Sequence, residues 1–159
     1  MARNVYGLDL GSYEIKVYDK KKDTIWKEKD VIALKNEKEI FAVGDEAFSM
    51  YEKAPSNIEV VFPMKEGVIS RFHDMQFLLQ NLLKKDRQFA RGSEYVVAVP
   101  TDVTEVEKKA FFDLVIHSTA KAKEVNIVER SIADAVGLNL DVQNTKGVFI
   151  VNFGGETTE

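Results

Sequence analysis

Hydrophobic and polar residues alternate along residues 5–19, which read VYGLDLGSYEIKVYD. The apolar residues recur at every second position on both sides of a short polar turn, and this pattern predicts two β-strands joined as a hairpin. Asp9 lies between Gly7 and Gly11 near the end of the first strand. A third strand is predicted at residues 24–27 (TIWK), so the chain begins with a three-stranded meander.

The next block, roughly residues 29–63, contains only short apolar runs separated by polar turns. It looks like an excursion from the main sheet, and we expect a small inserted α+β unit here. Its predicted elements are strands at residues 31–34, 40–43 and 58–62 and a short helix at residues 44–52.

Helical and extended patterns alternate in the remainder of the chain. Residues 70–85 carry an apolar stripe at helical spacing and predict an amphipathic helix. Thr104 and Glu107 have the spacing of a capping box, which predicts that a second helix begins there and runs to about Ser118. The residues expected to face inward from this second helix are Val106, Ala110, Phe111, Leu114 and Val115.

A third helix is predicted from about Ser131 to Gly137, with Gly137 supplying a left-handed C-cap. Strands are predicted at residues 95–99, 125–128 and 147–151. Helices between strands imply parallel pairing with right-handed crossovers. The fold class is therefore predicted as α/β, with a mixed five-stranded sheet and flanking helices.

The first turn has the residue types of an anion site. A carboxylate such as Asp9 near the end of a buried strand is costly unless it has a role, and Gly11 lets backbone N–H groups come close to an anion. Asp9 is suitably placed for a hydrated Mg²⁺, and Lys16 could reach a phosphate. An ordinary hairpin with a surface Asp and Lys has the same pattern, and these residues alone favour that simpler interpretation.

Composition narrows the classes of function. The chain has 159 residues, 45% of them hydrophobic and 30% charged, which suits one globular domain with its own core. The net charge of −4 and the lack of a basic run argue against nucleic acid. The absence of cysteine excludes disulfides and thiolate chemistry and fits a cytoplasmic protein. His73 and His117 lie on different predicted helices, so we expect no histidine metal site.

We expect neither a signal peptide nor a membrane-spanning segment, although a peripheral membrane contact stays open. The sequence stops at residues 148–159 (VFIVNFGGETTE), where a predicted strand leads into a Gly-Gly turn. A domain rarely finishes on the loop after a central strand. We therefore expect the sequence to be a piece of a longer protein or a natural half-length form.

Four stretches of the chain resemble the MreB family of bacterial actin-like proteins, in the superfamily of actin, heat-shock chaperones and sugar kinases. Residues 7–19 resemble its first phosphate loop, and residues 151–159 resemble its second. Residues 41–72, with the run PMKEGVI, and residues 96–125, with VPTDVTEVEKKA, resemble its small subdomain and a helix entry. The resemblance covers essentially the whole chain but only the N-terminal half of the family fold.

This resemblance implies a ribonuclease H-like fold. Residues 1–28 and 64–159 would form the core subdomain, residues 29–63 would form the small inserted subdomain, and the C-terminal half would be absent. The family binds ATP with Mg²⁺ in a cleft and polymerises into membrane-associated filaments that organise cell-wall synthesis. The partners implied are thus further copies of the chain and the cell-wall synthesis machinery.

The resemblance implies roles for individual residues of this chain. Asp9 matches the aspartate near Mg²⁺, through water, and Lys16 could reach a phosphate from the second strand. The remaining nucleotide-binding candidates form the two turns: Gly11, Ser12, Tyr13 and Glu14 in the first, and Gly154, Gly155, Glu156 and Thr157 in the second.

Three departures from the family pattern predict weak or lost ATP hydrolysis. Arg130 stands where the family has the glutamate that orients the attacking water, and Glu129 is one residue early, a rotation of about 100° on a helix. Asn152 replaces an aspartate, and Glu156 replaces a glycine. Glu156 and Glu14 would both bring carboxylates toward the phosphates, and Glu156 adds a Cβ where φ could need to be positive.

Two other functions stay open. A sugar kinase of the same superfamily needs a carboxylate base, for which this half offers only Asp9. A non-polymerising interaction module is the other alternative. Lys20–Lys22 and Phe89 are candidate membrane contacts, but a solvated turn and a partly buried side chain are the favoured interpretations.

Overall fold

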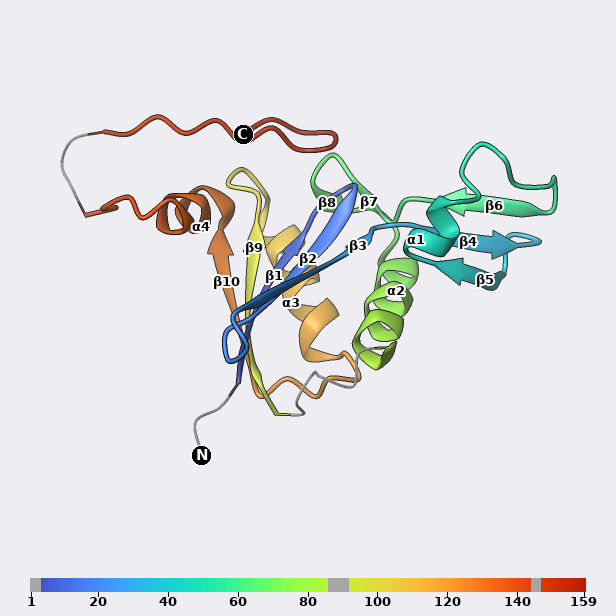
Figure 1. The fold of residues 1–159 in the computed structure, drawn as a ribbon, viewed down its shortest axis with the longest axis horizontal. Helices are drawn as coiled ribbons and strands as arrows, with labels where there is room; N and C mark the ends of the chain where they lie inside the picture. Colours follow the sequence, from blue (N-terminus) through green and yellow to red (C-terminus); the bar gives the residue numbers. More distant parts are fainter. Residues whose placement is uncertain (1–3, 86–91, 144–146) are drawn as a thin grey trace.

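The computed structural model describes residues 4–85, 92–143 and 147–159. A five-stranded sheet in the order β10-β9-β1-β2-β3 forms its centre (Figure 1). The first two pairings, β1 with β2 and β2 with β3, are antiparallel, whereas β1 with β9 and β9 with β10 are parallel. This confirms the predicted mixed sheet. Its strands are β1 (Val5–Leu10), β2 (Glu14–Asp19), β3 (Thr24–Lys29), β9 (Glu94–Val99) and β10 (Glu124–Glu129).

The hydrophobic core lies between one face of this sheet and two helices, α2 (Phe72–Lys85) and α3 (Glu105–Ile116). Every second residue of β1 and β9 points into it, as expected for strands with a single buried face. The apolar stripe of α2 packs against them. Fully or nearly fully buried members of this core include Tyr6, Leu8, Leu10, Met75, Leu78, Tyr95, Val97, Phe111 and Leu114.

The helix ends test two sequence predictions. Both halves of the capping box at α3 form between Thr104 and Glu107, which confirms that start. Val106 was wrongly placed inward, because it lies in the first turn of α3 with 79% of its surface exposed. The last helix, α4 (Arg130–Gly137), includes Gly137 as its final residue. The left-handed residue that follows α4 is Asn139, at φ 56°, rather than the predicted Gly137.

A second, three-stranded sheet in the order β5-β4-β6 carries the short helix α1 (Asp45–Phe48). Its strands are β4 (Ile32–Lys35), β5 (Glu39–Val43) and β6 (Ile58–Val61). The predicted helix at residues 44–52 is shorter than expected, because turns follow Phe48 and Glu52 adopts φ 60°. A two-stranded hairpin of β7 (Met64–Lys65) and β8 (Val68–Ile69) was not predicted, since two-residue strands carry no periodicity.

Residues 147–159, called the C-terminal segment below, cross the ends of the large sheet (Figure 1). The strand predicted at residues 147–151 is wrong, because these residues are extended but pair with no strand in the described part of the chain. Phe149 is 90% exposed as a result. The one bridge within the segment joins Phe153 and Thr158.

No helix in the described ranges is long and apolar enough to cross a membrane. The membrane prediction for Phe89 falls outside the described residues.

Candidate functional site

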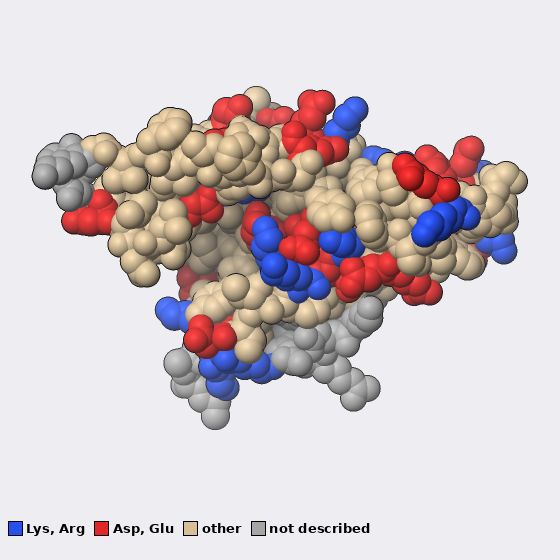
Figure 2. Space-filling model, turned by 45° about the horizontal axis from the view of Figure 1, so that its top comes forward, with Lys and Arg blue, Asp and Glu red and all other residues tan. Residues whose placement is uncertain are grey.

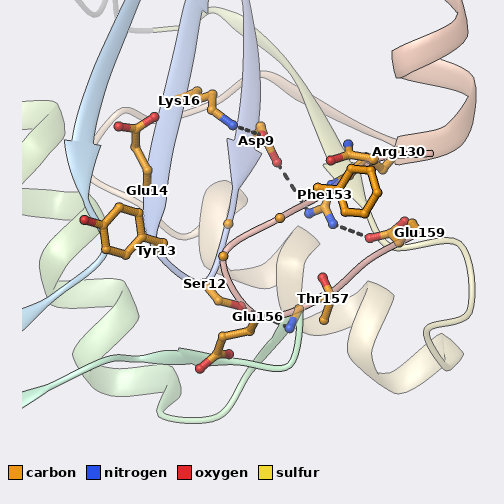
Figure 3. A pocket seen from close by; sticks show the side chains of 15 residues that line it. Asp9, Ser12, Tyr13, Glu14, Lys16, Arg130, Phe153, Glu156, Thr157 and Glu159 are labelled. Atoms are coloured by element: carbon orange, nitrogen blue, oxygen red, sulfur yellow. Dashed lines mark hydrogen bonds and ion pairs between the residues drawn. The ribbon is translucent and has the colours of Figure 1, made fainter. Parts of the chain in front are cut away.

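Two glycine turns from opposite ends of the chain line one pocket of about 200 Å³ (Figure 3). The first turn, residues 11–13, joins β1 to β2. The second, residues 154–157, closes a hairpin in which Asn152 and Glu159 exchange backbone hydrogen bonds of 2.8 and 3.0 Å. The β7–β8 turn completes the wall, because the Gly67 N–H donates to the Ser12 hydroxyl over 3.1 Å.

Close approaches in both turns leave little room for a side chain at the glycines. The Gly11 N–H donates to the Glu14 carbonyl over 3.3 Å, and a Cβ on Gly11 would lie 3.0 Å from that oxygen. A Cβ on Gly154 would lie 2.9 Å from the Thr157 carbonyl. One on Gly155 would lie 2.7 Å from the Tyr13 Cβ, so the two turns are in direct contact.

Charged side chains of alternating sign run along the pocket. The Lys16 ammonium lies 2.9 Å from Oδ2 of Asp9, and Nη2 of Arg130 lies 3.4 Å from Oδ1 of the same carboxylate. Nη1 of Arg130 donates to Oε1 of Glu159. In the view of Figure 2, basic and acidic side chains lie next to one another in the centre of the molecule, beside a largely uncharged area over the C-terminal segment. The four charges Lys16, Asp9, Arg130 and Glu159 sum to zero.

Several polar groups at the pocket have no hydrogen-bond partner among the described residues. Three are buried side-chain atoms: Oδ1 of Asp9, Nε of Arg130 and Oε2 of Glu159. The others are the backbone N–H groups of the turns, at Ser12, Tyr13, Gly155 and Glu156. Unpaired donors of this kind in consecutive turn residues form concavities that bind anions.

The predicted repulsion from Glu14 and Glu156 does not describe the structure, because both carboxylates are engaged. Glu156 turns toward the β7–β8 hairpin and accepts the Glu66 N–H over 2.7 Å (Figure 3). Its φ is not positive, so replacing glycine here brings no backbone strain. Glu14 lies 3.6 and 3.9 Å from the ammonium groups of Lys27 and Lys29.

The other two departures also make defined contacts. Arg130 begins α4, and its side chain is only 11% exposed between Asp9 and Glu159. Glu129, the adjacent acid, is exposed and lines no part of the pocket, so it does not take the place of the missing glutamate. The Asn152 amide donates to Asp134 over 2.7 Å and fixes the C-terminal segment to α4.

Magnesium does not fit beside Asp9 as the charges are arranged. Its two oxygens already face the Lys16 ammonium and the Arg130 guanidinium, and no group of three acidic or histidine side chains suited to a metal occurs among the described residues. A dication held through water would approach that guanidinium. At a separation of roughly 5 Å the repulsion is about 7 kcal/mol at an effective dielectric of 20.

All ten predicted nucleotide-binding residues line this single pocket. The sequence interpretation missed Gly67, Phe153 and Glu159, which line it as well. The signal for Gly67 was its position in the PMKEGVI run, but only the fold brings that turn to Ser12. For Glu159 the sequence held no signal, because it lies 29 residues from Arg130 along the chain.

Comparison with known proteins matches the family described as MreB/Mbl protein over residues 3–159. The chain is 34% identical over 167 aligned positions to the cell shape-determining protein MreB of Escherichia coli strain K12, covering all of this chain and 48% of the relative. Among solved structures, MreB5 of Spiroplasma citri bound to ADP matches 99% of the chain and 47% of its own, with a TM-score of 0.88 and 26% identity. The structure of Spiroplasma citri MreB5 bound to AMPPNP matches 95% of this chain and 46% of its own, with a TM-score of 0.82 and 25% identity. The chain thus spans about half the length of these relatives.

Proposed function

Since the chain belongs to the MreB/Mbl family, we propose that it is the phosphate-binding half of an actin-like, cell-shape-determining protein whose filament formation is linked to a nucleotide. The observation that carries this proposal is the meeting of the two glycine turns in one pocket with unpaired N–H donors. At about 200 Å³ the pocket is smaller than a typical ligand site, so it suits the phosphates rather than a whole nucleotide.

We propose ADP or ATP as the ligand, because two family structures are described as bound to ADP and to AMPPNP. The ammonium of Lys16 and the guanidinium of Arg130 are the positively charged groups that line this pocket. Charge-assisted hydrogen bonds from such groups to phosphate oxygens are about twice as strong as neutral ones.

Hydrolysis of ATP would be weak or absent. The resemblance assigns a water-orienting glutamate to the position of Arg130, and a guanidinium cannot accept a proton from water. Arg130 is instead held by Asp9 and Glu159. The bound nucleotide would then act as a structural ligand rather than as a substrate for hydrolysis.

The proposed assembly follows the family. Residues 1–28 and 64–159 act as the core subdomain and residues 29–63 as the small subdomain of a longer polymerising protein. Copies of the same protein and the cell-wall synthesis machinery are the partners, in the cytoplasm with a peripheral contact to the membrane.

Calorimetric titration of ATP and ADP into the protein tests the nucleotide proposal. Lys16→Gln removes a phosphate donor and should weaken binding by roughly tenfold to a hundredfold, whereas Lys20→Gln on the exposed turn serves as the matched control. Absence of binding would overturn the proposed ligand. Steady release of phosphate from ATP would contradict weak hydrolysis.

Sedimentation of the complete protein separates the proposed filament from the alternatives. Nucleotide-dependent pelleting supports a cytoskeletal role. A monomer with sugar-dependent ATP turnover would indicate a kinase, and a monomer without turnover would indicate an interaction module.

A further inference from the structure

We infer that Arg130 is the cation that balances a bound phosphate beside Asp9, so that this pocket takes a nucleoside diphosphate or triphosphate in its metal-free form. The inference rests on the proposed function, since it concerns how the same site holds its ligand.

The guanidinium of Arg130 is fixed beside Asp9, the carboxylate that the resemblance assigns to the metal. The residue is nine-tenths buried, and carboxylates hold it from both sides, Asp9 at 3.4 Å and Glu159 through a hydrogen bond. An arginine keeps its charge at any physiological pH. A fixed positive charge at the pocket wall is therefore a permanent part of this protein.

Donors for the phosphate remain after these contacts are counted. The Lys16 ammonium carries three hydrogens, of which Asp9 takes one. The turn residues add the N–H groups of Ser12, Tyr13, Gly155 and Glu156, which have no acceptor in the described part of the chain. Together they can satisfy the oxygens of a phosphate group without a metal ion.

The carboxylates near the pocket do not cancel this advantage. Asp9 and Glu159 are each paired with Arg130, and Glu14 lies close to two lysine ammonium groups. Glu156 accepts a backbone N–H at the β7–β8 turn. Magnesium brought in with a nucleotide would instead compete with Arg130 for Asp9, so the ion offers no gain at this position.

Titration of ADP into the protein, once in EDTA and once in magnesium chloride, tests the inference without any substitution. We expect the two dissociation constants to agree within about threefold. Arg130→Glu should weaken binding in EDTA by about tenfold or more, with recovery in magnesium. Arg130→Lys keeps the charge and should retain binding in EDTA.

Lys109→Glu is the matched control, because it makes the same change of charge on the exposed face of α3 and should leave both titrations unchanged. Binding of ADP to the unaltered protein in magnesium but not in EDTA would overturn this inference and leave the proposed function standing. Failure to bind ADP under either condition would overturn the proposed nucleotide site itself. Circular dichroism of each variant identifies any that is unfolded, and the comparison on the unaltered protein then decides.

Discussion

The side-chain amide of Asn152 donates a hydrogen bond to the carboxylate of Asp134 over 2.7 Å and so ties the C-terminal segment to α4. Each of the three departures from the family pattern, at Arg130, Asn152 and Glu156, makes a contact between the C-terminal segment and another part of the fold. Arg130 holds Glu159, and Glu156 accepts a backbone N–H from the β7–β8 hairpin. The substitutions are therefore connected, since together they fix the second glycine turn against the rest of the fold.

Asn152→Asp should loosen the C-terminal segment. The change replaces a donor by a second carboxylate opposite Asp134, which removes a charge-assisted hydrogen bond worth about 2 kcal/mol and adds repulsion. Hydrogen exchange at the backbone amides of Asn152 and Glu159 should accelerate by roughly 30-fold or more. Asn57→Asp, at an exposed loop position, controls for the added charge. Unchanged exchange at both amides would show that this contact does not hold the segment.

Gly155→Ala should push the two turns of the pocket apart. The new methyl group would lie 2.7 Å from the Tyr13 Cβ, an atom that cannot move without its backbone. Overpacking of this kind costs about 1–3 kcal/mol and should weaken ADP binding. Gly137→Ala is the control, because its methyl group meets nothing within 4 Å and should stabilise the chain by about 0.4–1 kcal/mol. Thermal melts and ADP titrations of both variants measure the difference, and equal behaviour would contradict the contact.

Asp30 predicts a pH dependence of stability. It is fully buried after β3, neither carboxyl oxygen has a hydrogen-bond partner in the described structure, and burial raises its pKa well above the usual 3.8. The folded chain therefore binds this proton more tightly than the unfolded chain. Its contribution to stability is full below 3.8 and is lost as the pH rises through the folded pKa.

Asp30→Asn keeps the shape without the ionisation. The melting temperature of the variant relative to the unaltered protein should rise between pH 4 and pH 8, in a series of thermal melts. Asp102→Asn, at an exposed position, should show no such trend. A constant difference across the series would mean that Asp30 does not carry the effect.

Phe111→Ala and Val106→Ala should separate the two faces of α3. Phe111 is fully buried, and its truncation should cost about 3–5 kcal/mol of unfolding free energy. Val106 is 79% exposed, and its truncation should change stability by no more than about 0.5 kcal/mol. Urea denaturation compares the two. A large loss at Val106 would restore the inward orientation that the helical spacing predicted.

Sequence patterns predicted the helices and strands well where both partners of an interaction lie close together in the sequence. The capping box of Thr104 and Glu107 is such a case, and so is the hairpin at residues 5–19. The strand predicted at residues 147–151 failed because alternation reports a tendency to extend, whereas a strand also needs a neighbour. The inward orientation predicted for Val106 was wrong because helical periodicity does not show at which turn of the helix the core ends.

Part of the pocket lining was also predicted from the sequence. The part that was not predicted depends on contacts between residues far apart in the chain. The family resemblance predicted that the two glycine turns share one phosphate site, and both turns line the pocket. The partners of Arg130 could not be read from the chain, since Asp9 and Glu159 come from its two ends and meet only through the order of the strands. Long-range charge pairs of this kind become visible with the topology.

Tyr13 lines the pocket and also contacts α1, the helix carried by the small sheet. Its Cβ lies against Gly155, while its ring packs edge-on against Phe48 at 5.5 Å, the first of a series of aromatic contacts that continues through Tyr51 to Phe62. A rotation of the small sheet would either break the contact between Tyr13 and Phe48 or move the first glycine turn of the phosphate pocket. Tyr13 thus couples the rim of the phosphate pocket to the small sheet, next to the hydrogen bond from the Asp45 N–H to Glu28 of β3.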